Sequence, residues 1–157
     1  ETANTLQEQR YTLKKDEKLR HKRLVDDLFA NGKTLYEFPL RLTWRVIDAE
    51  ELAGSFRSDI PAKVGRIQML VTVPKKKRRR AVDRVLMRRR IREAYRLNRM
   101  PLKDIAENID NAGTLSLAFI YMSDKNLPYS LIEARMKRLL FKLEKELQPD
   151  NRQTPTP

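Results

Sequence analysis

The segment 114–122 (TLSLAFIYM) most constrains the fold, because it is an uncharged, largely apolar run of β-prone residues. A run of this kind is typical of a central strand in a sheet. The chain has 157 residues, which is enough for one domain of ordinary size with one modest core. A central strand needs further strands to pair with it and helices to cover the sheet that they form.

Further strands are predicted on the N-terminal side of this run. Residues 38–47 (FPLRLTWRVI) alternate between apolar and polar side chains, which predicts a half-buried strand. Its inner face should carry Phe38, Leu40, Leu42, Trp44 and Val46. Residues 66–73 (RIQMLVTV) predict another strand, ended by Pro74, and a short extra strand can lie near 33–38. The intervening residues 49–65 have the composition of a long loop.

Three segments have the periodicity and composition of helices. Residues 16–31 predict a short amphipathic helix that ends at Gly32. Residues 81–98 predict a strong helix with Pro101 just beyond it, and residues 129–147 predict a last helix with an apolar stripe. The order of elements indicates an α+β domain, in which helices pack on one small mixed sheet.

The two ends of the chain are polar. Residues 1–10 and 149–157 offer no apolar surface to offset the entropy of ordering, so we expect disordered tails around one domain spanning 11–148. The N-terminal residues have no features of a secretory signal, and no stretch approaches the roughly 20 apolar residues that span a bilayer. The chain has no cysteine, which excludes disulfides and thiolate metal sites. We expect a cytoplasmic protein.

The positive charge is concentrated in residues 75–99. This segment holds 13 Lys or Arg residues and two acids, a local net charge of +11, whereas the whole chain carries +13. The rest of the chain is therefore nearly neutral. Such a placement favours a polyanionic partner, which can be RNA, DNA or an acidic membrane.

The basic segment consists of a loop followed by the predicted helix. The loop carries Lys75, Lys76, Lys77, Arg78, Arg79 and Arg80, and the helix carries Arg84, Arg88, Arg89, Arg92 and Arg96. Four-residue spacing places most of the helical arginines on one stripe, where each like-charged pair costs a few tenths of a kcal/mol, on the order of 0.3. An anionic ligand would relieve this repulsion, and the planar guanidinium group suits phosphate. We interpret the segment as an RNA-binding face rather than a solvated charged surface.

The string from Ala81 to Arg96 and the order of elements resemble the protein component of bacterial ribonuclease P. The resemblance covers about residues 11–147 and includes the passages 11–19, 29–32 and 71–76. That family carries a basic signature, R-N-R-x-K-R-x-x-R, in the corresponding helix. Its basic positions are matched by Arg84, Arg88, Arg89 and Arg92. The chain departs from the signature at Val85, where the family has Asn, and at Leu86, where the family has Arg.

The resemblance implies a compact α-β sandwich with a left-handed β-α-β crossover, although right-handed crossovers dominate in general. It also implies a function in which the protein, monomeric when free, pairs with ribonuclease P RNA. The RNA would hold the catalytic Mg²⁺ ions and remove the 5′ leader from precursor tRNA. The protein would bind this RNA through its basic helix and loop, and the leader through a cleft between the first helix and the sheet.

By position, the leader cleft would include Val25, Phe29, Arg41 and Thr43. Aromatic side chains suit such a cleft because they stack on unpaired bases. Phe29 is the one aromatic residue of the four, and the alternative for Phe29 is an ordinary core position.

The sequence contains few groups that could catalyse a reaction. His21 is the only histidine, and it lies beside basic residues, so we expect a solvated or phosphate-contacting side chain. The four glycines form no phosphate-binding loop, and the acidic pairs 26–27 and 50–51 are adjacent residues that do not share a helix face. We therefore expect no catalytic residue and no metal site in this chain.

Two other functions remain open from the sequence. A ribosomal protein or RNA chaperone has a similar charge and size. A peripheral membrane protein would need bulky apolar residues exposed opposite the arginines, and here that helix face is required for the core.

Overall fold

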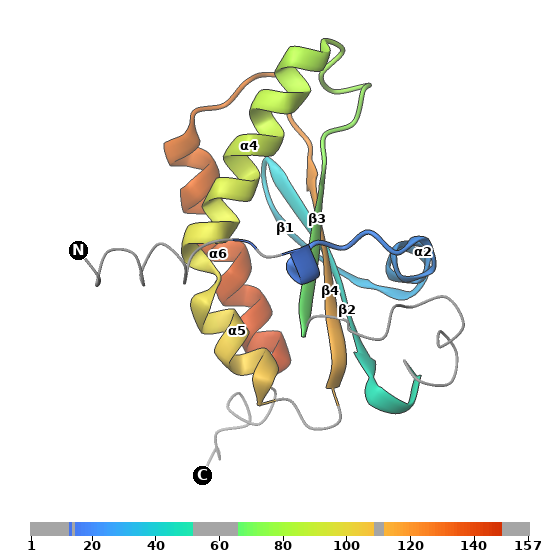
Figure 1. The fold of residues 1–157 in the computed structure, drawn as a ribbon. Helices are drawn as coiled ribbons and strands as arrows, with labels where there is room; N and C mark the ends of the chain where they lie inside the picture. The colour runs from blue at the N-terminus through green and yellow to red at the C-terminus, as the bar shows by residue number, and fades with distance from the viewer. Residues whose placement is uncertain (1–12, 14, 52–65, 109–111, 149–157) are drawn as a thin grey trace, which may run out of the picture.

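The structure is a computed structural model that describes residues 13, 15–51, 66–108 and 112–148 (Figure 1). The predicted tails and most of the predicted 49–65 loop lie outside these residues. The sheet consists of β1 (Lys33–Glu37), β2 (Leu40–Asp48), β3 (Ile67–Thr72) and β4 (Ala112–Tyr121). Their order in the sheet is β1-β2-β4-β3, so the predicted central strand is confirmed as β4 and the extra strand near 33–38 as β1.

The sheet is mixed, as predicted. β1 and β2 form an antiparallel hairpin, and its turn contains the cis peptide bond between Phe38 and Pro39. β4 pairs antiparallel with β2 and parallel with β3. The parallel neighbours β3 and β4 are joined through helices, which makes a β-α-β unit. The left-handedness of this unit stays a prediction.

Two helices have the bounds that the sequence predicted, α4 (Ala81–Asn98) and α6 (Tyr129–Leu147). The predicted helix over 16–31 is wrong in its first half, because only α2 (Lys22–Asn31) and a short 3₁₀ turn, η1 (Lys15–Glu17), are formed. Between them the chain runs beside β3, where Leu19 N donates to Met69 O at 2.8 Å. The backbone groups of this segment form hydrogen bonds with the edge strand β3 instead of within a helical turn.

A further helix, α5 (Met100–Glu107), was not predicted, because Pro101 was interpreted as a residue outside the helices. Pro101 lies in the first turn of α5. A proline is tolerated there because the N–H that it lacks would have no partner inside the helix. Leu102 and Ala106 bury the inner side of α5 and extend the core.

The helices cover the two faces of the sheet unequally. Figure 1 shows α4, α5 and α6 on one face and α2 on the other. The larger core lies between the three helices and the sheet, and includes Leu42, Leu117 and Phe119. On the opposite face, Leu24 and Leu28 of α2 form a smaller core with strand residues.

The prediction of a half-buried β2 is wrong, because both of its faces are largely covered. Thr43, on the face toward α2, is only 6% exposed, and Ile47 on the same face is fully buried. Gly32 ends α2 against this strand, where a Cβ atom would lie 2.8 Å from Thr43 Cγ2. Phe38 was predicted to point inward with Leu40, but it lies in the hairpin turn and is exposed.

Candidate nucleic-acid interface

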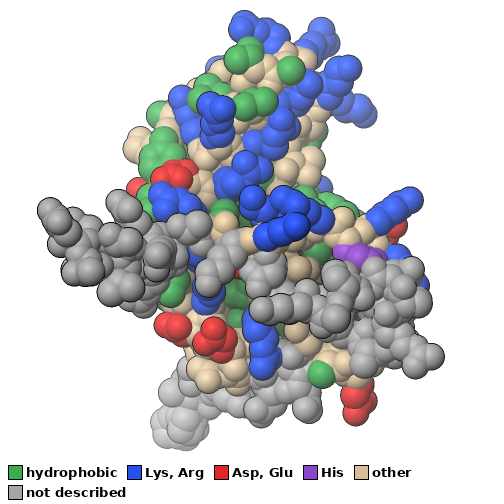
Figure 2. All heavy atoms as spheres, in the orientation of Figure 1, with side chains coloured by type: hydrophobic (Ala, Val, Ile, Leu, Met, Phe, Trp, Pro, Cys, Tyr) green, Lys and Arg blue, Asp and Glu red, His purple; other side chains and the backbone are tan. Residues whose placement is uncertain are grey.

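The basic face lies along the outer side of α4 and over the loop that precedes it. α4 packs on the sheet through Met87, Ile91, Ala94 and Tyr95, which are fully buried. This packing turns the other side of the helix toward solvent. Figure 2 shows Lys and Arg side chains gathered along this part of the molecule, from the loop at one end of α4 toward its middle.

In seven of the eleven predicted RNA-binding residues, the side chain has no hydrogen bond or ion pair to any residue that the structure describes. These are Lys75, Lys76, Lys77, Arg79, Arg88, Arg89 and Arg92. Their charges are not neutralised by described carboxylates, so an anion can interact with them at little cost in broken contacts. We refer to these seven side chains as the free basic face.

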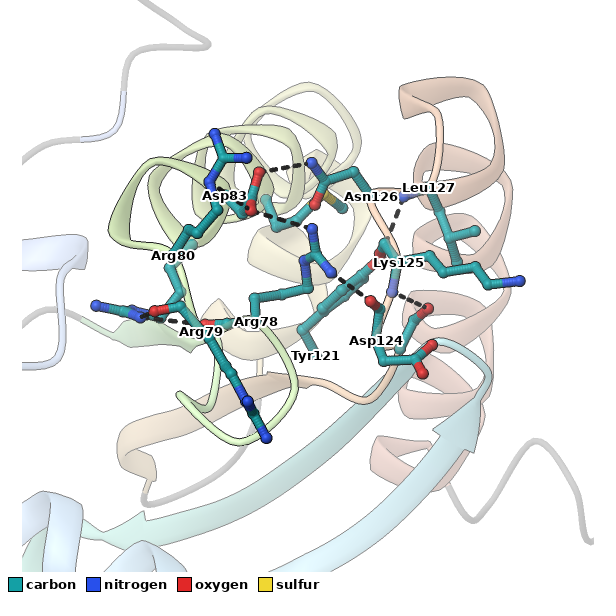
Figure 3. Close-up of polar contacts among 12 residues, drawn as sticks. Arg78, Arg79, Arg80, Asp83, Tyr121, Asp124, Lys125, Asn126 and Leu127 are labelled. Carbon is teal, nitrogen blue, oxygen red and sulfur yellow. Dashed lines mark hydrogen bonds and ion pairs between the residues drawn. The ribbon is translucent and has the colours of Figure 1, made fainter.

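Two other predicted residues, Arg78 and Arg84, shape the loop, and Figure 3 shows the Arg78 side chain directed toward Asp83 and Asp124. Arg78 lies 3.2 Å from the Asp83 carboxylate and also donates to Asp124 O. Arg84 Nη1 donates to the carbonyl oxygens of Arg78, at 3.1 Å, and Arg79, at 2.6 Å. These contacts hold the loop against the first turn of α4. The sequence could not reveal the contact with Asp124, because Asp124 is 46 positions away from Arg78.

Asp83 is the acidic centre of this arrangement. A hydrogen bond from Asn126 Nδ2, at 2.9 Å, holds the pKa of the Asp83 carboxyl below its usual value, with help from the charges of Arg80 and Arg78. The carboxylate therefore stays ionised and joins the loop, α4 and the segment before α6. Arg80 lies 3.5 Å from Asp83, but its side chain remains largely exposed and can still meet an anion.

Arg96 differs from the arginines before it because it has an acidic partner. Glu93 accepts hydrogen bonds from Arg96 Nε at 3.0 Å and Arg96 Nη2 at 2.5 Å. This interaction lowers the pKa of Glu93 and raises that of Arg96. The predicted stripe therefore loses part of its net charge at its C-terminal end.

The two departures from the signature both lie on α4. Val85 is 38% exposed and Leu86 is half-buried, and Val82, one turn earlier, is 60% exposed. Apolar surface thus interrupts the free basic face near the N-terminal end of α4.

The four predicted cleft residues lie on the α2 side of the sheet. Phe29 is 47% exposed, so the alternative of an ordinary core position does not hold for it. Val25 and Arg41 are half-buried, whereas Thr43 is nearly covered and offers little surface to a ligand.

The structure adds one aromatic residue that the sequence reasoning missed on this side. Tyr36 of β1 pairs with Arg41 of β2, so both side chains lie on the face toward α2. Tyr36 is 56% exposed. Its neighbour Leu35 packs into the larger core on the other face. Successive side chains of a strand point to opposite faces, so a strand over 33–37 with Leu35 in the core would have placed Tyr36 on the outer face.

Groups that could bind metal or catalyse a reaction are sparse in the described residues. No three His, Asp or Glu side chains there are grouped as metal ligands. His21 immediately precedes α2, and its Nδ1 has no hydrogen-bond partner in the described part of the chain. None of the described helices combines the length and apolar character needed to cross a bilayer.

Comparison with known proteins connects this architecture to one family. The family model described as Ribonuclease P matches residues 13–144. The ribonuclease P protein component of Porphyromonas gingivalis W83 is 32% identical over 133 residues, which are 85% of this chain and 87% of the relative. The same protein from a second strain of that species gives the same values.

Two solved structures share the fold at low sequence identity. The Staphylococcus aureus RNase P protein has a TM-score of 0.52 at 13% identity, covering 82% of this chain and 95% of its own. The Thermotoga maritima RNase P protein has a TM-score of 0.54 at 18% identity, covering 80% of this chain and 96% of its own. The family model spans most of the chain, and the relatives match over nearly their whole length. This chain belongs to the ribonuclease P protein family.

Proposed function

We propose that this chain is the protein subunit of a ribonuclease P ribonucleoprotein and that it binds the RNA subunit through the free basic face. One observation carries the proposal: seven cations lie on one loop and one side of one helix, without described acidic partners. Each phosphate that they neutralise releases counterions from the RNA, which favours binding at low salt.

The surface on the α2 side, where the leader cleft is predicted, provides a second contact, to the single-stranded 5′ leader of precursor tRNA. Phe29 and Tyr36 offer exposed aromatic rings for stacking on unpaired bases, and Arg41 offers a cation for the backbone. The two surfaces lie on different elements. One protein molecule can therefore contact the RNA subunit and the leader together.

The protein assists the reaction and the RNA performs it. In this proposal the RNA subunit holds the Mg²⁺ ions that activate water and stabilise the leaving oxygen. The protein lowers the repulsion between two polyanions, so that less Mg²⁺ is needed to bring the RNA subunit and the precursor together. The free protein is a monomer that acts in the cytoplasm.

A reconstituted cleavage assay tests this function. Ribonuclease P RNA and precursor tRNA are combined at low Mg²⁺, with and without the protein, and removal of the leader is followed over time. We expect the protein to stimulate cleavage, and Arg88→Gln with Arg92→Gln to reduce the stimulation. Binding of these RNAs without any stimulation would favour the alternative, a ribosomal protein or RNA chaperone.

A further inference from the structure

A pocket of about 570 Å³ lies beside the free basic face, between the N-terminal segment, α4 and the start of α6. Arg89, Arg92 and Arg96 line it from α4, Lys18 lines it from the N-terminal segment, and Tyr129 lines it from α6. This volume falls within the range of roughly 300–1,000 Å³ that small ligands occupy in proteins. The pocket is therefore large enough to accommodate a single nucleotide and is open to solvent on one side.

The pocket is strongly cationic. Arg90 also lines the pocket. Its Nη1 donates to Leu127 O at 2.5 Å, a bond that fixes the position of the guanidinium group without neutralising its charge. The one acid among the lining residues, Glu93, is already bound by Arg96. The described residues supply no second carboxylate to this lining, so the cations far outnumber the acids.

The remaining walls are apolar or aromatic. Leu13 lies on the N-terminal side, and the ring of Tyr129 lies at the start of α6. Tyr129 Oη donates to Glu133 Oε2 at 3.2 Å, which directs its hydroxyl group along α6. Burial, with help from the charge of Glu133, raises the pKa of Tyr129 to about 12, so the ring adds no negative charge at neutral pH.

The wall that carries Lys18 is held in place by neighbouring contacts. Lys18 forms a parallel bridge with Met69 of β3 through its backbone, and Glu17 beside it is ion-paired with Arg99, which is fully buried. The Lys18 side chain has no ion pair or hydrogen bond to the described residues and is only partly buried. The backbone of Lys18 is thus held in place, whereas its ammonium group can contact an anion.

We propose that this pocket holds one unpaired nucleotide of the RNA, with its phosphate between Lys18 and the α4 arginines and its base against the Tyr129 ring. This inference rests on the proposed function and adds a specific site to it. A flat basic surface would attract any phosphate backbone, whereas a pocket with an aromatic wall selects an unstacked nucleotide. The nucleotide can belong to ribonuclease P RNA or to precursor tRNA.

The first test removes the cation that lies outside the basic segment. Lys18→Ala is compared with Lys137→Ala, which removes an exposed lysine on α6. Equilibrium binding to ribonuclease P RNA and, separately, to precursor tRNA is measured over a range of KCl concentrations. For one of the two RNAs we expect Lys18→Ala to reduce the slope of log K against log salt by about 0.7–0.9, the value for one phosphate contact, and Lys137→Ala to leave it unchanged.

The second test removes the aromatic wall. Tyr129→Leu keeps an apolar side chain in the partly buried position, and Tyr129→Phe keeps the ring while it loses the bond to Glu133. We expect Tyr129→Leu to weaken binding of the same RNA by at least about fivefold at every salt concentration, as the loss of one stacking contact does. Tyr129→Phe should bind like the parent protein. Circular dichroism and urea unfolding establish that each variant is folded.

The outcomes separate this proposal from the proposed function. If Lys18→Ala behaves like Lys137→Ala for both RNAs, or if a folded Tyr129→Leu variant binds both normally, the nucleotide pocket is refuted. In that case a strong effect of Arg88→Gln with Arg92→Gln would still support the basic face. If neither those arginines nor Lys18 affects binding, the proposed function fails as well.

Discussion

Glu17 and Arg99 form a buried ion pair although they are 82 positions apart, with Arg99 Nε donating to Glu17 Oε1 at 3.0 Å. The Arg99 side chain is fully buried, and Lys103 Nζ lies 3.4 Å from the same carboxylate oxygen. The pair joins the N-terminal segment to the junction of α4 and α5. It therefore sets where Lys18 lies relative to the arginines of α4.

Breaking this pair should destabilise the whole domain. Glu17→Ala leaves the buried guanidinium group of Arg99 without its carboxylate, and we expect a loss of about 3 kcal/mol in the free energy of unfolding, measured with urea. Lys103→Ala is the control, because it removes the partly exposed partner of the same carboxylate and should cost about 1 kcal/mol or less. Equal losses in the two variants would contradict the structural role of the Glu17–Arg99 pair.

Arg84 and Arg88 are one helical turn apart, but they should affect the basic loop differently. Arg84→Gln removes the hydrogen bonds to the carbonyl oxygens of Arg78 and Arg79, whereas Arg88 has no described partner. We expect hydrogen exchange of the amides in 78–80 to become faster in Arg84→Gln and to stay unchanged in Arg88→Gln. Both variants lose one positive charge, so a common effect would show that charge, not bonding, controls the loop.

Stability should depend on pH through Glu37, which attaches β1 to α6. A hydrogen bond from Lys142 lowers the pKa of Glu37 below its usual 4.5, and the charges of Arg138 and Arg135 add to this shift. The Glu37 carboxyl group binds its proton less readily in the folded protein than in the unfolded chain. Glu37 therefore contributes its full stabilisation above about pH 4.5. The stabilisation is lost as the pH falls through the lower pKa of the folded protein.

Urea unfolding between pH 3 and pH 7 measures this dependence. Glu37→Gln should flatten the acid limb of the stability curve and lower stability at pH 7. The matched control is Glu107→Gln, an exposed residue of α5 that forms no ion pair with the described residues. A Glu37→Gln curve parallel to that of the parent protein would show that the cluster on α6 does not hold this carboxylate.

Phe29 and Tyr36 should affect precursor tRNA more than mature tRNA. Replacing either ring by Ala removes a stacking surface worth about 1–3 kcal/mol, but only an RNA with a single-stranded leader can use it. Affinities for the two RNAs are compared by equilibrium binding. Phe141→Ala is the control, because this ring is equally exposed but lies on α6, on the other side of the sheet. A similar loss for both RNAs would place the leader elsewhere.

The sequence predicted the elements whose pattern is local. The helices α4 and α6 were identified with their bounds, because their composition and apolar periodicity extend over many turns. The start of α2 was missed because backbone pairing of Leu19 with Met69 competes with the helix. α5 was missed because a proline can lie just beyond the end of one helix or in the first turn of the next, and the sequence alone does not distinguish the two.

The basic face was predictable as a concentration of charge. The sequence did not show which of its arginines bind other parts of the protein and which remain free for RNA. Arg78 and Arg99 are similar to Arg79 and Arg92 in the sequence. Only the fold brings Asp83 and Asp124 to Arg78, and Glu17 to Arg99. Tyr36 was missed for a related reason, since its partner Arg41 becomes its neighbour only when the hairpin forms.

The most direct measurement is the salt dependence of binding to ribonuclease P RNA for three proteins: the parent chain, Arg88→Gln with Arg92→Gln, and Lys137→Gln with Lys145→Gln. The last two lose equal charge, from α4 and from α6 respectively. We expect the α4 variant to reduce the slope of log K against log salt by about 1.4–1.8, corresponding to two phosphate contacts, and the α6 variant to leave it close to the parent value. Equal slopes in the two variants, or an unchanged slope in the α4 variant, would contradict the assignment of RNA binding to the free basic face.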